Sequence, residues 1–138
     1  MKKILLLALL FVFLCTTACS TALERDKKQM LKTYCSDENY ISLSGEIVEI
    51  ANEENKLTIK YKDSKLHPSN DYTCEYLVFA DTTANLKVGD TIVYTTVKEQ
   101  IANYSTPIVA ITKDDKEILD FQTGKENLIN WVNQLQAK

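Results

Sequence analysis

The chain has 138 residues, of which 16 are basic and 19 acidic, and its formal net charge is −3. This length leaves room for one domain. An acidic surface repels phosphate backbones, and the single arginine, Arg25, argues against bidentate phosphate or carboxylate clamps. Nucleic acid is therefore not expected as a partner.

The first 18 residues have the features of a secretory signal peptide. A basic start, Met1–Lys3, is followed by an apolar run at Ile4–Leu14 and by the small residues Thr16–Ala18. The apolar run is shorter than the roughly 20 residues that a membrane-spanning helix needs. We therefore expect residues 1–18 to be removed on export.

The end of this segment, Ala18 followed by Cys19, resembles the bacterial lipobox. Thr16 departs from that pattern, since leucine is usual there. The resemblance implies cleavage before Cys19, a diacylglyceryl thioether on its sulfur and anchoring outside the cytoplasm. Ser20 is not the aspartate of an inner-membrane retention signal, which points to the outer membrane if the host has two membranes. An ordinary secreted protein with a chance cysteine is the alternative.

Loss of Lys2 and Lys3 leaves 14 basic and 19 acidic residues, a formal charge of −5. Cys35 and Cys74 then remain besides the lipidated cysteine, and an oxidising compartment favours a disulfide between them. Closing a loop of about 40 residues would contribute roughly 4 kcal/mol. Two separate buried thiols are the alternative, and His67 as the only imidazole disfavours a metal pair.

Helical composition predicts a helix over residues 22–34, with Leu23, Met30 and Leu31 on one thin face that leans on the domain. Alternation then predicts a strand from Tyr40 to Ile50, with a bulge where the phase slips at Ile47. A polar turn leads to a second strand at residues 57–62, completing a hairpin.

Three further strands are expected at Cys74–Ala80, Thr91–Val97 and Ile108–Thr112, with one helical turn at Asp81–Asn85. Gly89 lies in a turn and is free to take a positive φ.

A capping box of Thr123 and Glu126 predicts the start of a C-terminal helix. Leu128 and Val132 lie on the buried face of this helix, and Trp131 is expected to dock it on the sheet.

Two segments, SGEIVEI at Ser44–Ile50 and LKVGDTIVY at Leu86–Tyr94, resemble the first and fourth strands of the bacterial OB-fold family of exported proteins. The resemblance covers roughly Tyr40–Thr112. It implies a mainly β fold, a small five-stranded OB-like barrel, here flanked by an N-terminal and a C-terminal α-helix. The expected organisation is a signal peptide at 1–18, a tether and short helix at 19–39, and the barrel with its helix at 40–138.

Catalytic motifs such as HExxH, a P-loop, GxSxG or CxxC do not occur, so we expect neither an enzyme nor a cofactor or metal. The acidic pairs lack the spacing of a calcium loop. The leading hypothesis is a binding or adaptor module for an envelope protein or a glycan. An enzyme or ion-handling protein centred on His67, with Asp63 or Asp71, is a second hypothesis, and a structural envelope-stress protein is a third.

Four tyrosines are the candidate binding residues, because OB folds bind ligands on strand faces that carry exposed aromatic rings. They lie on predicted strands or beside them: Tyr61, Tyr76, Tyr94 and Tyr104. The alternative is that these rings cover the barrel with their hydroxyls at the rim.

Overall fold

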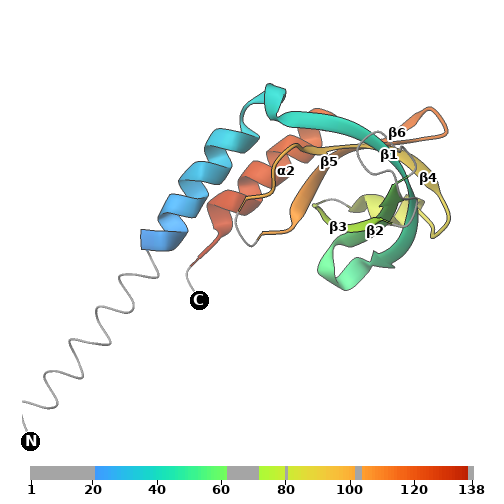
Figure 1. Ribbon diagram of the computed structural model, residues 1–138, viewed down its shortest axis with the longest axis horizontal. Helices are drawn as coiled ribbons and strands as arrows, with labels where there is room; N and C mark the ends of the chain where they lie inside the picture. Colours follow the sequence, from blue (N-terminus) through green and yellow to red (C-terminus); the bar gives the residue numbers. More distant parts are fainter. Residues whose placement is uncertain (1–20, 62–71, 80, 102–103, 137–138) are drawn as a thin grey trace, which may run out of the picture.

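The computed structural model describes residues 21–61, 72–79, 81–101 and 104–136, and its ribbon is drawn in Figure 1. Within these ranges, six strands form a curved sheet and two α-helices lie together on one side of it. The expected signal peptide, the expected lipidation site Cys19 and the loop with Asp63, His67 and Asp71 lie outside the described residues.

Five strands close into an OB-type barrel. β1 pairs antiparallel with both β2 and β4, β2 pairs with β3, and β4 pairs with β5. A parallel pairing of β3 with β5 closes the ring. This connectivity confirms the predicted mainly β, OB-like fold flanked by two helices. The strand bounds are Tyr40–Ala51 (β1), Lys56–Tyr61 (β2), Thr73–Val78 (β3), Thr91–Val97 (β4) and Thr106–Lys113 (β5).

A sixth strand, β6 (Lys116–Leu119), pairs antiparallel with β5 and was not predicted. The connecting residues Asp114 and Asp115 have φ values of 50° and 59°, as a two-residue type I′ hairpin turn requires. The sequence has Asp-Asp here instead of the usual Asn-Gly or Asp-Gly, and the strand has only four residues. For these two reasons the sequence analysis did not predict this hairpin.

The first strand bends sharply, as predicted. Its register against β2 shifts between Ile47 and Glu49, which is the expected bulge. At Gly45 an added Cβ would lie 2.4 Å from the Ile59 side chain and 2.8 Å from the Lys60 carbonyl oxygen. Glycine therefore permits the close approach of β1 and β2.

Alternate side chains of the strands point inward and form the barrel core. Its fully buried members include Ile47, Leu57, Ile59, Tyr76, Val78, Ile92, Tyr94, Ile108 and Ile111. Between β3 and β4 the expected single helical turn is present as η3 (Asp81–Asn85). Gly89 has the positive φ expected of it, at 93°.

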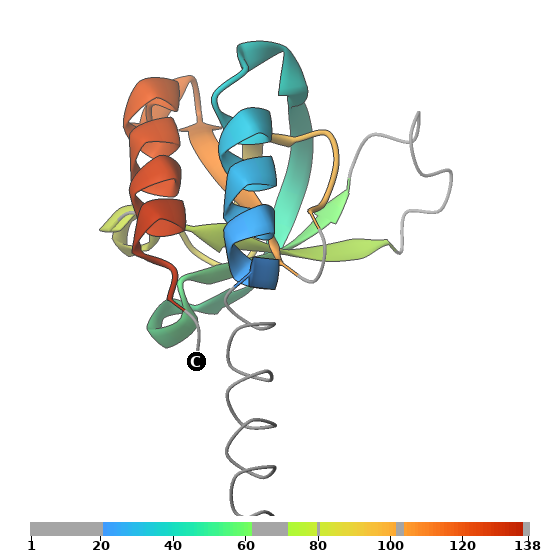
Figure 2. The same cartoon turned by 90° about the vertical axis from the view of Figure 1, so that its left-hand side faces the viewer.

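A second core lies between the barrel and the two helices. The N-terminal helix (residues 21–34) and α2 (Phe121–Gln134) run antiparallel, side by side (Figures 1 and 2). Met30 and Tyr34 are fully buried there, with Leu128 and Val132 of α2. The N-terminal helix thus builds a core, which corrects the expectation that it only leans on the domain. Tyr34, one turn after Met30, supplies the buried surface that the sequence interpretation did not count.

The predicted capping box of α2 is wrong. The helix begins at Phe121, and the Asp120 side chain accepts a hydrogen bond from the Thr123 backbone N–H at 2.9 Å. Hydrogen bonding with the Thr123 side chain is the main cause that lowers the pKa of the Asp120 carboxyl, and the backbone hydrogen bond lowers it further. Thr123 therefore lies inside the helix, because aspartate three residues earlier is an equally good N-cap.

The structure does not form the predicted disulfide, since Cys35 and Cys74 are free thiols in it. Cys35 is exposed directly after the N-terminal helix, where its carbonyl accepts a hydrogen bond from Lys125. Cys74 lies in β3, opposite Ile59 of β2, and packs against the barrel core. The two cysteines therefore belong to different parts of the fold: the helical layer and the barrel.

Neither described helix has both the length and the apolar character that crossing a membrane would require.

Candidate binding pocket at the barrel mouth

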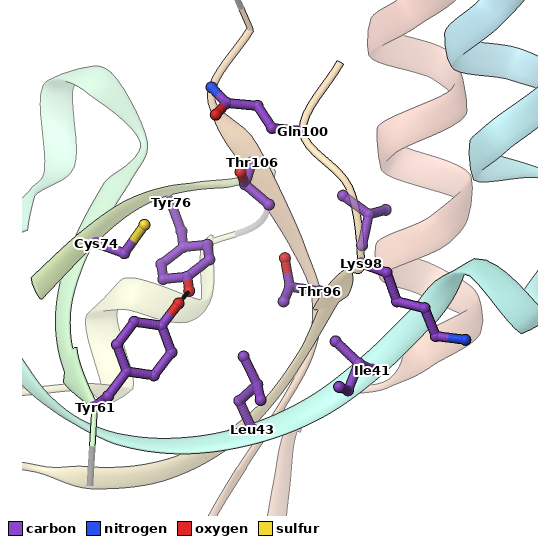
Figure 3. Close-up of a pocket in the computed structure, with 10 residues that line it drawn as sticks. Ile41, Leu43, Tyr61, Cys74, Tyr76, Thr96, Lys98, Gln100 and Thr106 are labelled. Atoms are coloured by element: carbon purple, nitrogen blue, oxygen red, sulfur yellow. Dashed lines mark hydrogen bonds between the residues drawn. The ribbon is translucent and has the colours of Figure 1, made fainter. Parts of the chain in front are cut away.

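A pocket of about 450 Å³ opens at one end of the barrel interior. The strand registers explain its position: Ile41 near the start of β1 pairs with Thr96 near the end of β4, and Tyr61 ends β2 where β3 begins. Figure 3 shows the side chains gathered from these strands. The described lining residues are Ile41, Leu43, Tyr61, Cys74, Tyr76, Thr96, Val97, Lys98, Gln100 and Thr106.

Three tyrosine hydroxyls meet at this end of the barrel core. The Tyr61 and Tyr76 hydroxyls are hydrogen-bonded to each other, and the Tyr76 hydroxyl oxygen lies 3.2 Å from that of Tyr94. The Tyr76 and Tyr94 rings pack edge to face, with their centroids 5.1 Å apart. Tyr61 and Tyr76 line the pocket, whereas Tyr94 is not among its described lining residues.

Burial keeps these phenols neutral. It is the main cause that raises the pKa of Tyr76, and the hydrogen bonds with Tyr61 and Tyr94 raise it further. Burial also raises the pKa of Tyr94 above that of a free phenol. At physiological pH the cluster therefore offers hydroxyls that donate and accept hydrogen bonds, and none of them serves as a base.

Cys74 places a thiol in the same pocket. Burial raises the pKa of Tyr61, the hydrogen bond with Tyr76 lowers it, and the nearby Cys74 raises it again. None of the described lining residues is a histidine or a carboxylate. The thiol therefore has no general base beside it among the described pocket residues.

Among the described lining residues only Lys98, at the rim, is charged. Its ammonium group points away from the pocket and donates a hydrogen bond to the Glu38 carbonyl oxygen, so that its aliphatic stem lines the wall (Figure 3). The Thr96 hydroxyl donates to the Pro107 carbonyl oxygen at 2.7 Å. Gln100 donates to the Tyr104 carbonyl oxygen at 2.8 Å.

The structure brings together three of the four candidate tyrosines but does not form the expected exposed ring face. Tyr76 and Tyr94 are only 2% and 1% exposed. Tyr104 lies in the seam between barrel and helices, where its ring contacts Trp131 at a centroid distance of 6.1 Å. Trp131 also stacks on Phe79 and so docks α2 on the barrel, as predicted.

Sequence reasoning missed the other pocket residues, notably Ile41, Leu43 and Thr96. Alternation placed Ile41 and Leu43 on one face of their strand, but only the closure of the ring identifies which positions on that face lie at an open end. The described residues contain no cluster of three or more histidine, cysteine or carboxylate side chains placed to hold a metal ion. The His67 hypothesis falls outside the described residues and stays a prediction.

The fold and the pocket define an OB-type barrel with a cavity at its mouth, whose described lining residues are neutral except for Lys98. No family model matches the sequence, and no curated protein matches it. Among solved structures the chain is similar to apo-CusF from Escherichia coli, with 19% identity, a TM-score of 0.42, and coverage of 54% of this chain and 87% of that one. For Ag(I)-bound CusF the identity is 19% and the TM-score 0.41, over 54% of this chain and 97% of the other. The OB assignment itself rests on the strand pairing described above.

Proposed function

We propose that the protein is an exported, lipid-anchored binding module without catalytic activity, whose barrel-mouth pocket receives a side chain of an envelope protein or a small molecule. The observation that carries this proposal is the pocket itself, which is open and whose described lining residues are neutral except for Lys98. Pockets of roughly 300–1,000 Å³ with a few convergent polar groups are the usual form of small-ligand sites.

The lining chemistry supports binding over catalysis. A nucleophilic mechanism needs an activated nucleophile with a base in hydrogen-bond reach. Among the described pocket residues, Cys74 has no imidazole or carboxylate beside it, and burial raises the pKa of the tyrosines away from the range of a useful base.

The buried rings favour an inserted group over a stacked sugar. Glycan binding on an OB face uses exposed aromatic rings, whereas Tyr76 and Tyr94 present mainly their hydroxyl ends. A ligand must therefore enter the pocket, as the side chain of a partner protein or a compact molecule does. A glycan remains the competing ligand in the test below.

Acylation of Cys19 would hold the domain close to a membrane. In the sequence only Ser20 separates Cys19 from the helix described from residue 21. Two residues of chain reach about 7 Å at most. The pocket would then serve partners at or near the bilayer surface, on the outer membrane if the host has two.

The test uses the full chain in bacterial cells, with a photo-crosslinking residue at the Lys98 position on the pocket rim. We expect one defined envelope partner to be crosslinked, and mass spectrometry to find acyl chains on Cys19. Leu43→Trp fills the pocket and should abolish the crosslink. Val93→Trp is the matched control, because Val93 is 49% exposed on the next strand.

Thr106→Trp, on another wall of the pocket, repeats the block in case Leu43→Trp does not fold. Unmodified Cys19 would refute the anchoring. Crosslinks that persist in both folded pocket variants, or binding only to purified glycans, would refute the proposed use of the pocket.

A further inference from the structure

We infer that the barrel-mouth pocket selects an uncharged ligand that combines an apolar body with a hydroxyl or carbonyl oxygen. This inference deepens the proposed binding function by naming its ligand class, and it rests on that function.

The first step concerns charge. Of the ten described lining residues only Lys98 is charged, and its ammonium group lies outside, on the Glu38 carbonyl oxygen. An anion or a cation inside the pocket would lose its hydration and find no opposite charge directed into the pocket by the described lining residues. Such a transfer costs several kcal/mol per ion.

The second step concerns the apolar wall. Ile41 and Leu43 project from β1 into the pocket, and Val97 adds a branched side chain from β4. In Figure 3 Ile41 and Leu43 lie across the cavity from Tyr61 and Tyr76. A ligand with an apolar body can cover this wall and remove it from water.

The third step concerns the hydroxyl pair at the opposite side. The Tyr61 and Tyr76 hydroxyls already bond to each other, and each oxygen can both donate and accept. Because they reorient as a pair, they can serve either a ligand hydroxyl or a ligand carbonyl. A pure hydrocarbon gains nothing from them, so the oxygen supplies orientation and selectivity.

The charge step is tested with three ligands of one shape: benzyl alcohol, benzoate and benzylammonium. The full chain is reconstituted in lipid nanodiscs, and methyl NMR follows Ile41 and Leu43. We expect benzyl alcohol to bind at least about tenfold more tightly than either ion. Equal or tighter binding of an ion, or no response of these methyl groups to any of the three, would overturn the inference.

The hydroxyl step is tested by removing one hydroxyl from the protein and, separately, the hydroxyl from the ligand. Tyr61→Phe should weaken the binding of benzyl alcohol about two- to tenfold, which corresponds to the loss of one neutral hydrogen bond. The affinity for toluene should not change. Tyr104→Phe is the control, because its hydroxyl is outside the pocket, and should change neither ligand. An equal loss of affinity for benzyl alcohol and toluene, or no loss for benzyl alcohol, would contradict the role of the hydroxyl.

The two free cysteines give an independent measurement. Cys74 lies in the pocket and Cys35 is exposed, so Cys35 is an internal reference in the same molecule. Benzyl methanethiosulfonate is uncharged, whereas the sulfonatoethyl and trimethylammonioethyl reagents carry opposite charges. Peptide-resolved mass spectrometry should show the labelling ratio of Cys74 to Cys35 falling about tenfold for both charged reagents.

An unchanged labelling ratio would refute the uncharged pocket. These outcomes are separate from those of the proposed function. The acylation of Cys19 and the crosslinked partner are measured in cells, whereas ligand class is measured on the isolated chain.

Discussion

Gly124 of α2 lies directly against the backbone of Val109 in β5, and an added Cβ would sit 1.9 Å from the Val109 carbonyl oxygen. Glycine weakens a helix by about 1 kcal/mol relative to alanine. The contact explains why α2 keeps a glycine in its first turns: it brings the helix backbone onto the strand, and Val109 and Leu128 are fully buried around it.

Gly124→Ala should therefore destabilise the protein despite its better helix propensity. We expect the free energy of unfolding to fall by about 1–3 kcal/mol, because the helix must shift off β5. Urea denaturation measures the change. Asn130→Ala, at an exposed position of the same helix, should be neutral or slightly stabilising, and an equally stable Gly124→Ala would contradict the close packing.

The two helices are joined at both ends by lysines. Lys27 donates to the Leu135 carbonyl oxygen at 3.0 Å, and Lys125 donates to that of Cys35 at 2.9 Å. Each lysine thus meets the negative end of the other helix. Lys125 also pairs with Asp37 at 2.6 Å.

Lys125→Met should lower the free energy of unfolding by roughly 0.5–1.5 kcal/mol. The loss should shrink at high salt, because screening weakens the charge interactions that the wild type makes. Lys116→Met, in the exposed edge strand, is the control and should have little effect. A loss that does not depend on salt would indicate lost packing of the lysine stem instead.

Stability should fall at alkaline pH. Burial raises the pKa of Tyr34 from 10.0 to about 12, and burial also raises that of Tyr40. A phenol with a raised folded-state pKa stabilises the fold fully below pH 10, and this contribution is lost as pH rises toward 12. Denaturant midpoints measured from pH 8 to 12 should stay level at first and then drop.

Tyr40→Phe tests the source of that drop. It removes the hydrogen bond that the Tyr40 hydroxyl donates to the Tyr34 carbonyl oxygen at 2.7 Å, so stability at pH 8 should fall by about 1 kcal/mol. The alkaline drop should become shallower, because one buried phenol no longer ionises. Tyr72→Phe, at an exposed position, should leave the profile unchanged.

Reducing agents should leave the folded state unaffected. Cys35 and Cys74 are free thiols, so dithiothreitol should not change the melting temperature of the native protein. Intact mass should show two alkylatable thiols besides any on Cys19. A lower melting temperature on reduction, with a mass gain of two hydrogens, would show that the disulfide predicted from the sequence forms after all.

Local patterns predicted the barrel well. Alternation located β1, and the phase slip at Ile47 located the bulge, because side chains alternate strictly between the two faces of a strand. The density of β-branched residues located β4. The amphipathic spacing of Leu128 and Val132 located α2. These signals arise within one element and need no knowledge of neighbours.

The errors came from relations between elements. Asp120 and Thr123 are both competent caps, and in the folded protein Asp120 is the N-cap of α2. Cys35 and Cys74 are the two cysteines expected to remain for a disulfide in an oxidising compartment. In the fold, however, Cys35 belongs to the helical layer and Cys74 to the barrel. The local sequence around each residue does not encode how far apart two residues lie in the folded protein.

The sequence by itself determined the element types, the bend of β1 and the gathering of tyrosines on strands, because hydrophobic periodicity and glycine placement act locally. Only the tertiary structure decided that Tyr61, Tyr76 and Tyr94 join their hydroxyls while Tyr104 packs in another layer. The reason is physical: the parallel pairing of β3 with β5 closes the ring, and closure alone determines which inward side chains are buried and which line an open end.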